Sequence, residues 1–294
     1  MSQCKIGTAP VSWGIWFTED DKQMSWERCL DEMAIAGYTG MELGPWGYMP
    51  NKANKLKEEL KKRDIQLVST TLMDDLTCTK NTNKMIEQLD EMASIQVQFE
   101  EAKYVVLIDA CYTDLFTGKQ IRKKDLTERE KDIFYHNIKK INNHAKTKYD
   151  LEVVYHPHSQ THIETEEQIE EFLERTNINL CFDTGHHAYM GADVINFIKQ
   201  HHNRISYIHL KNCDLSVLEA TQQNNWSLAK AVQEGVMVEP AKGIVDMNKL
   251  VQILKKINFD GWIIVEQDMY PAPFEKPLPI AKRTRNYLRE IGMG

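Results

Sequence analysis

Three stretches of the sequence place metal-binding side chains directly after short apolar runs: CFDTGHHAYMG at 181–191, IHLK at 208–211 and VEQD at 265–268. The side chains concerned are those of Asp183, His209 and Glu266. Two carboxylates and one imidazole form a donor set that suits Mn²⁺, Co²⁺, Fe²⁺ or Zn²⁺ better than Ca²⁺. The sequence therefore predicts a metal site, if the fold brings these three positions together.

Residues beside these three are candidates for proton transfer and substrate binding. Lys211 lies two residues after His209, on the same side of an extended chain. A lysine next to a metal site can stabilise an enolate or shuttle protons. Asp268 follows Glu266 with the same spacing, and His186 comes directly after a glycine. We expect Asp268 and His186 to contact the substrate.

The stretch VVYHPHSQTHIET at 153–165 supplies three further candidates. His156 and His158 are two residues apart and point to the same side of an extended chain, and Glu164 precedes a predicted helix. Each of the three is a candidate fourth metal ligand or acid–base group, and we choose Glu164 as the ligand. The alternative for Glu164 is that its charge only favours the start of the helix.

Weaker signals come from two other strand ends. The loop PVSWGIW carries Trp13 and Trp16, and aromatic faces beside a polar site often pack on sugar rings. Glu42 ends the second predicted strand and is a candidate to bind hydroxyl groups or serve as a base. We expect Trp13 and Glu42 to bind the substrate, with burial in the core as the alternative for the tryptophans.

Eight short β-rich runs alternate with helical patterns, and several are Val- and Ile-rich runs typical of strands covered on both faces. The predicted strands span residues 4–9, 39–43, 65–71, 103–108, 151–156, 178–182, 204–210 and 261–266. The predicted helices span residues 25–37, 51–63, 84–101, 127–148, 165–175, 192–202, 246–257 and 277–291. This pattern predicts an α/β protein, a closed (β/α)₈ TIM barrel whose strand ends share one functional face.

A single domain, residues 1–294, accounts for the whole pattern, because no Ser/Gly-rich linker or shift in composition divides the chain. No GxGxxG follows the first strand, which argues against a doubly wound open sheet. The stretches 109–125 and 211–245 are predicted to be irregular lids or binding loops. Ser25 and Gly37 are expected to cap the first helix, and Thr165 with Gln168 to form a capping box.

Composition excludes several classes of function. The net charge of the 294 residues is −7, and an acidic chain without a basic tract is a poor candidate for nucleic acid or anionic membranes. No apolar run reaches the length of a membrane span. Six scattered cysteines without a CxxC pair predict reduced thiols, and the first residues lack a signal-peptide pattern. These features predict a cytoplasmic protein.

Six motifs together carry a resemblance to a known family: APVSWG, MELGPWGY, YHPH…ET, FDTGHHAY, IHLKN and GWIIVEQD. The chain resembles the xylose isomerase-like (sugar phosphate isomerase/epimerase) TIM barrels, and among them it looks most similar to the inosose (2-keto-myo-inositol) dehydratases of inositol catabolism. The resemblance implies a metal held by Glu, Asp, His and Glu, and Asp183, His209 and Glu266 match the last three. The fifth strand ends in YHPH instead of Glu, so Glu164 is the substitute. Asn212 stands where the dehydratases usually have Asp.

The resemblance implies a metal-dependent lyase that dehydrates a polyhydroxy ketone through an enediolate. Mn²⁺ or Co²⁺ is the expected metal, with Zn²⁺, Fe²⁺ or Mg²⁺ as alternatives. Glu266, Glu164 or a histidine of the fifth strand would remove the α-proton. His156, His158 or Lys211 would protonate the leaving hydroxyl.

Other functions remain open from the sequence. The same site would serve a ketose isomerase or epimerase, if the proton returns to another carbon or face. Alternatives of another class are an endonuclease IV-like phosphodiesterase, which the net charge disfavours, and a non-catalytic sugar-binding barrel. The expected partner is a small polyol or ketose, and a homo-oligomer is common among such barrels.

Overall fold

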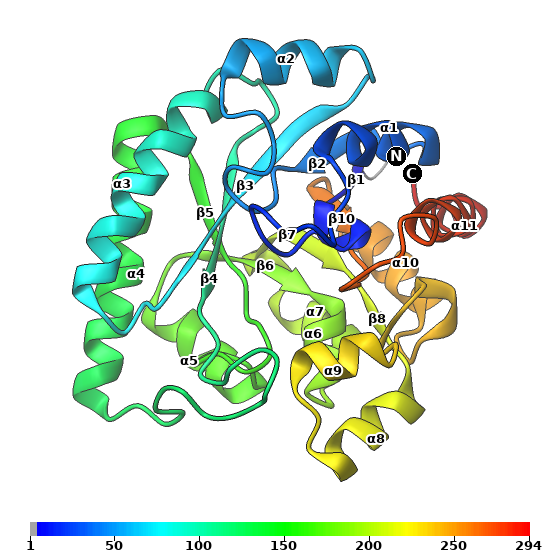
Figure 1. The fold of residues 1–294 in the computed structure, drawn as a ribbon. Helices are drawn as coiled ribbons and strands as arrows, with labels where there is room; N and C mark the ends of the chain where they lie inside the picture. Colours follow the sequence, from blue (N-terminus) through cyan, green and yellow to red (C-terminus); the bar gives the residue numbers. More distant parts are fainter. Residues whose placement is uncertain (1–4) are drawn as a thin grey trace.

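The computed structural model describes residues 5–294, in which eight parallel strands close into a barrel (Figure 1). The strands are β1 (Lys5–Thr8), β2 (Gly40–Glu42), β3 (Gln66–Asp74), β4 (Tyr104–Asp109), β5 (Glu152–Tyr155), β6 (Asn179–Asp183), β7 (Ile205–Leu210) and β10 (Trp262–Val265). They follow one another around the barrel, and β1 pairs with both β2 and β10 to close it. The eight predicted strands and the TIM-barrel fold are confirmed. Residue 4, where the first predicted strand begins, lies outside the described residues.

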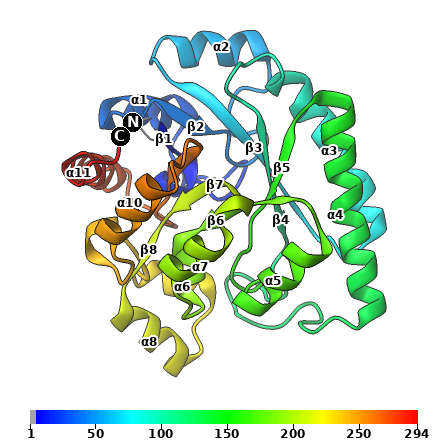
Figure 2. The same cartoon turned by 180° about the vertical axis from the view of Figure 1, so that it is seen from behind.

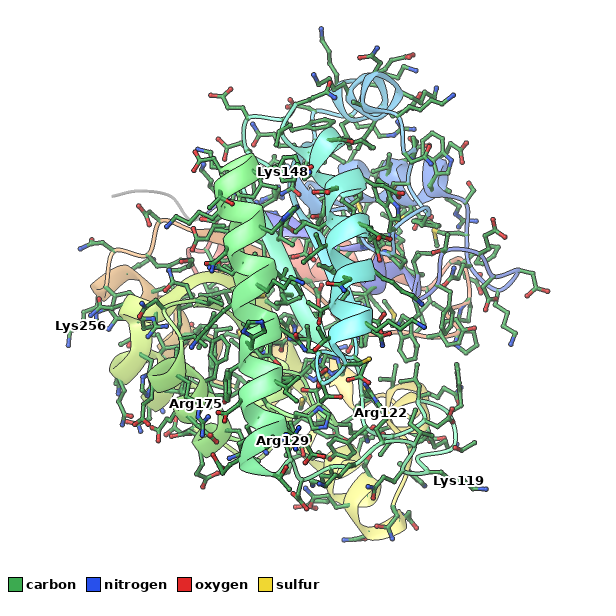
Figure 3. The ribbon with its side chains drawn as sticks, turned by 90° about the vertical axis from the view of Figure 1, so that its left-hand side faces the viewer. Lys119, Arg122, Arg129, Lys148, Arg175 and Lys256 are labelled. Carbon is green, nitrogen blue, oxygen red and sulfur yellow. The ribbon has the colours of Figure 1, made fainter. Side chains whose placement is uncertain are left out.

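Helices cover the outside of the barrel, as Figure 2 shows from behind. They are α1 (Trp26–Ala36), α2 (Ala53–Lys61), α3 (Thr79–Gln96), α4 (Glu128–Tyr149), α5 (Glu166–Arg175), α6 (Thr184–Tyr189), α7 (Val194–His201), α10 (Met247–Lys256) and α11 (Pro277–Glu290). α3 and α4 run side by side along one flank (Figure 3). Within residues 5–294, no helix combines the length and the apolar character that a membrane crossing requires.

Capping contacts explain where two of the helices begin and end. The side chain of Ser25 accepts a hydrogen bond from the backbone N–H of Arg28, and Gly37 ends α1 with a φ of 88°. Thr165 and Gln168 form a capping box at the start of α5. These caps are the ones that the sequence predicts.

The third helix begins and ends earlier than the predicted span 84–101. Its first turn contains the polar residues KNTN at 80–83, so the hydrophobic period does not reveal it. It ends at Gln96, whose side-chain amide donates to the carbonyls of Ala102 and Tyr104. These contacts depend on the chain folding back on itself, so the local pattern could not indicate them.

The segment 211–245 contains regular structure that the sequence pattern did not indicate. In it, β8 (Asn212–Cys213) and β9 (Met237–Val238) pair as a two-stranded antiparallel sheet. The chain between these two strands forms α8 (Leu215–Asn224) and α9 (Leu228–Gln233). α9 meets the loop that follows β4, where the N–H of Ala229 donates to the carbonyl of Leu115 at 3.1 Å. The two long insertions therefore lie against each other, at the bottom of Figure 1.

Alternation along the strands decides which side chains enter the barrel. A small apolar cluster fills its interior, and its members include Val154, Cys181, Tyr207 and Ile264. Two residues after each of these, in the same order, come His156, Asp183, His209 and Glu266. Because side chains of an extended chain alternate between two faces, these four share the inward side at the carboxyl ends of neighbouring strands.

Candidate metal centre and active site

Asp183, His209 and Glu266 are buried and converge at the carboxyl end of the barrel. The Nδ1 atom of His209 lies 3.7 Å from Asp183 Oδ2 and 3.4 Å from Glu266 Oε2. Strand register explains the approach, because Asp183 is paired directly with His209 and Glu266 follows the next strand of the barrel. The imidazole of His209 therefore lies between the carboxylates of Asp183 and Glu266.

His156 is a fourth donor beside these three. Its Nε2 atom lies 3.4 Å from Asp183 Oδ2. Donor atoms of His156, Asp183 and His186 lie within 4.8 Å of one another, and so do those of His156, Cys181 and His209. The thiol of Cys181 was not a candidate from the sequence, although its spacing from Asp183 places both on the inward side.

Glu164 does not join the cluster. Its carboxylate accepts hydrogen bonds from the hydroxyl of Tyr112 at 2.8 Å and from the backbone N–H of Gln160 at 2.7 Å, and Lys124 Nζ lies 3.4 Å away. The loop between β5 and α5 turns at Gln160, which has a φ of 66°, and this turn folds the carboxylate back onto the loop. The structure therefore brings His156, and not the expected Glu164, to the cluster of Asp183, His209 and Glu266.

The ammonium group of Lys211 lies among the carboxylates and is buried. Its Nζ atom is 3.3 Å from Asp183 Oδ2, 2.9 Å from Glu266 Oε2 and 3.1 Å from Asp268 Oδ1. Gly185 permits this arrangement, because a Cβ atom at that position would lie 2.3 Å from the Cβ of Lys211. A lysine held in this way keeps a positive charge and a set of N–H donors at the reaction site.

Glu42 orients the imidazole of His209. Its Oε1 atom lies 2.8 Å from His209 Nε2, and both side chains are buried. An imidazole that donates its Nε2 proton to a carboxylate presents the Nδ1 lone pair on its other side, here toward Asp183 and Glu266. Carboxylates often fix metal-binding histidines in this way. Glu42 also lines the cavity described below, where the sequence placed it as a substrate-binding residue.

The rings of His158 and His186 are in contact, with centroids 3.8 Å apart and an angle of 41° between their planes. His186 is buried, with Nδ1 3.0 Å from Ser159 Oγ and Nε2 3.3 Å from Lys211 Nζ. His158 Nδ1 donates to the carbonyl of Ser159 at 2.8 Å, and its ring lines the cavity. His158 therefore faces the substrate space, and His186, which we expected there, lies behind it.

Trp13 belongs to the core and not to the site. The loop after β1 forms a 3₁₀ helix, η1 (Pro10–Trp13), which directs the indole outward from the barrel. Its Nε1 donates to Glu32 of α1 at 3.0 Å, and only 1% of the residue is exposed. Trp16, three residues later, lines the cavity in its place.

Charge interactions set the protonation of the cluster. Burial by itself would raise the pKa of Asp183, but the charge of Lys211 outweighs it and holds this pKa well below 3.8. Burial would lower the pKa of Lys211, but Asp183, Asp268 and Glu266 raise it well above 10.5. Burial dominates at Glu266 and raises its pKa. Asp183 and Lys211 are therefore a carboxylate and an ammonium ion at neutral pH.

Within residues 5–294, several buried polar atoms of this cluster make no hydrogen bond. They include His156 Nδ1, His209 Nδ1 and two carboxylate oxygens, Asp183 Oδ2 and Asp268 Oδ1, which lie near the ammonium group of Lys211 without a hydrogen bond to it. Such atoms are costly unless an ion or water satisfies them. Three carboxylates, those of Asp183, Glu266 and Asp268, lie within 3.3 Å of the Lys211 ammonium group, and a fourth, that of Glu42, contacts His209. The excess of negative charge and the open donor atoms fit a divalent cation.

A cavity of about 780 Å³ opens at this end of the barrel. Its polar residues include Glu42, His156, His158, His209, Lys211, Glu266 and Asp268. Both long insertions contribute to its wall, Leu115 and Arg122 from the first and Leu228 from the second. Sequence patterns did not indicate Trp46, Asp74 or Arg122, which also line it, because they lie in or beside loops whose paths only the folded chain defines.

Comparisons with known proteins agree with this architecture. The family model for the xylose isomerase-like TIM barrel matches residues 30–291. Bacterial inosose dehydratases are 28–32% identical to the chain over at least 97% of its length. The inosose dehydratase of Clostridium tetani, for example, is 32% identical, and the alignment covers 97% of this chain and 96% of the relative.

Solved structures share the fold at lower identity. The probable 3-DHS dehydratase AsbF of Bacillus anthracis gives a TM-score of 0.73 at 19% identity, covering 97% of this chain and 98% of its own. The IOLI protein, whose crystal structure contains a bound zinc atom, gives a TM-score of 0.72 at 19% identity and covers 98% of both chains. With a family-model match over most of its length and relatives aligned along nearly all of it, the chain belongs to the xylose isomerase-like TIM barrel family.

Proposed function

We propose that this chain is a metal-dependent hydro-lyase that removes water from a polyhydroxy ketone of the inosose type. The observation that carries the proposal is the buried cluster of Asp183, His209, Glu266 and Lys211 at the carboxyl end of the barrel. Similarity to inosose dehydratases along nearly the whole chain supports both the reaction and the substrate class. It also favours dehydration over isomerisation or epimerisation.

Asp183, His209 and Glu266 would hold the divalent ion, with His156 as a fourth donor. Mn²⁺ or Co²⁺ is the expected metal, because such ions accept mixed imidazole and carboxylate ligands. When bound, the ion polarises the ketone oxygen and stabilises the negative charge that develops during proton removal. Glu42 would keep the Nδ1 atom of His209 aimed at the ion through the hydrogen bond to Nε2.

Two side chains are suited to move protons. His158 lines the cavity, and its Nδ1 is engaged by the carbonyl of Ser159, so Nε2 is the nitrogen left to accept the α-proton. Lys211 also lines the cavity and carries protons to donate. Asp268 lies in the cavity wall and forms an ion pair with Lys211. Its carboxylate would also accept a hydrogen bond from a substrate hydroxyl.

His158 and Lys211 together account for the protons that move during the elimination of water. The α-carbon gives its proton to His158, and the electron pair left behind forms the new carbon–carbon double bond as the β carbon–oxygen bond breaks. The leaving hydroxide takes a proton from Lys211 and departs as water. A proton then passes from the charged His158 back to Lys211 through solvent, which restores both groups. If the proton instead returned to the other carbon or the other face, the same residues would give an isomerase or an epimerase.

A turnover assay tests the proposal. Protein reconstituted with Mn²⁺ or Co²⁺ is expected to convert 2-keto-myo-inositol to a dehydrated diketone, which is followed by its ultraviolet absorbance and by mass. Protein treated with a chelator is the control and is expected to lose the activity. A product of unchanged mass would replace the lyase with an isomerase or epimerase. Bound metal without turnover of any inosose or ketose would favour a non-catalytic sugar-binding barrel.

The proposal also places the enzyme in the cytoplasm and in inositol catabolism. The five cysteines within residues 5–294 are free thiols, which suits a reducing compartment. Its partner would be a small ketone, and the net charge of −7 argues against nucleic acid or an anionic membrane surface. A homo-oligomer stays a prediction from the family resemblance.

A further inference from the structure

The cavity is larger than a single polyhydroxy ring requires. Its volume of about 780 Å³ lies toward the upper end of the range, about 300–1,000 Å³, of pockets that enclose drug-sized ligands. The metal-binding side chains occupy only its inner end. An inosose bound through its ketone at that end leaves the outer part of the cavity without a ligand.

Strand β3 shows how far the wall continues past the inner end. Ser69 of β3 is paired with Glu42, which contacts His209, and the strand continues to Asp74. Thr71 is the first residue of β3 that lines the cavity, and at roughly 3.3 Å per residue Asp74 lies about 10 Å further along the strand. Asp74 still lines the cavity. The substrate space is therefore deep as well as wide.

Aromatic side chains form one side of the outer part. Trp16, Phe17 and Trp46 all line it. The ring of Trp16 stacks on Tyr270 with centroids 4.8 Å apart and an angle of 17° between the planes, and Phe17 meets the edge of Tyr270 at 5.3 Å. Packing on Tyr270 holds Trp16 and Phe17 in place before any ligand binds.

Two apolar side chains at the mouth of the cavity are exposed to solvent. Met73 is 46% exposed and Ile121 is 62% exposed, and both line the cavity. Large exposed apolar side chains gathered around a hollow often mark a ligand-binding surface. A hydroxylated ring confined to the inner end would cover neither of them.

Charged groups also line the cavity. Asp75 Oδ1 lies 3.3 Å from a guanidinium nitrogen of Arg122, and Arg122 also donates to the carbonyl of Cys111. Asp74 accepts a hydrogen bond from the N–H of Asp75 at 2.7 Å. Arg122 lies at the end of the molecule that carries the two long insertions (Figure 3). The outer part thus combines aromatic faces with carboxylates and a guanidinium group.

We propose that the natural substrate has two rings, the reacting polyhydroxy ketone and a second sugar ring joined to it through an oxygen atom. A sugar ring has apolar C–H faces and hydroxyl edges. Its face would pack on Trp16 and Trp46, and its hydroxyls would reach Asp74, Asp75 and Arg122. This inference rests on the proposed function of the inner site and names the class of its substrate.

The test compares two ligands that differ only in the second ring, 2-keto-myo-inositol and its O-glucosyl derivative. Dissociation constants by calorimetry and kcat/KM are measured for both with the metal-loaded wild type. The two-ring ketone is expected to bind at least about tenfold more tightly. In Trp46→Ala this ratio is expected to fall toward one, and Trp46→Phe is expected to restore most of it, because it keeps an aromatic face.

Trp226→Ala is the matched control, since Trp226 lies between α8 and α9 outside the cavity wall and should leave the ratio of the two ligands as in the wild type. Equal binding of the two ketones by the wild type, or an equal loss for both in Trp46→Ala, would overturn the second subsite while leaving the dehydratase intact. Preference for an O-phenyl derivative over the glucosyl one would overturn the assignment of a sugar ring. If the proposed function is wrong, the result is different: the two-ring ketone still binds more tightly, but the enzyme converts neither of the two ketones.

Discussion

Replacing Lys211 with methionine is expected to lower kcat about a thousandfold while bound metal is retained. Methionine keeps much of the aliphatic volume but removes the ammonium group that contacts Asp183, Glu266 and Asp268. Loss of a positioned proton donor typically costs between about a hundred and ten thousandfold in rate. The carboxylates lose a competing cation, so their hold on a divalent ion should not weaken. Steady-state kinetics and elemental analysis of the same preparation measure both effects.

Lys242→Met is the matched control for this experiment. Lys242 lies in the same long insertion, its side chain is 61% exposed, and its ionic partner is Glu239. We expect its kcat to match the wild type. If Lys211→Met kept kcat within tenfold of the wild type, Lys211 would not be the proton donor in the elimination. Loss of metal from Lys211→Met would instead indicate that the lysine supports the architecture of the site.

Asp183→Asn is expected to remove most of the bound metal and, with it, the activity. The substitution is selective because Asp183 has two separate roles. Its Oδ1 atom accepts from the N–H groups of Gly185 and His186 and caps α6, whereas Oδ2 faces His156, His209 and Lys211. Asparagine can keep the cap and loses the negative charge at the second atom. We expect metal affinity to fall by more than about a hundredfold.

Asp193→Asn controls for the capping role. Asp193 caps α7 with the same pair of hydrogen bonds, to the N–H groups of Ile195 and Asn196. Its asparagine variant should keep wild-type metal content, and thermal unfolding of both variants should show that each remains folded. Near-stoichiometric metal in Asp183→Asn would contradict the assignment of this carboxylate as a ligand.

The sequence was sufficient for the parts of the site that strand register alone determines. His209 and Asp183 are paired across neighbouring strands, and Glu266 directly follows the next one, so alternation of side chains brings them together. Cys181 and His156 also lie on the inward side of their strands, because each is separated by an even number of positions from another inward residue. His156 follows the inward residue Val154 by two positions, so the alternation of the fifth strand favours it over Glu164, which lies in the loop beyond.

Loop conformations account for the other differences. Trp13 enters the core because η1 turns it toward α1, and a 3₁₀ helix of four residues has no clear sequence pattern. Glu164 is held by Tyr112, a residue from another loop, so its orientation depends on contacts between distant segments. The residues of the outer cavity, among them Trp46 and Arg122, come from several loops in the same way. Such contacts become visible only in the folded chain.

The most direct measurement of the central claim is the position of the metal in crystals of the Zn²⁺- or Co²⁺-reconstituted protein, located by anomalous diffraction. We expect one main peak, about 2 Å from each of Asp183 Oδ2, His209 Nδ1 and Glu266 Oε2, with His156 as the nearest further donor. A peak at Glu164, or no peak beside these three atoms in protein that carries stoichiometric metal, would contradict the account.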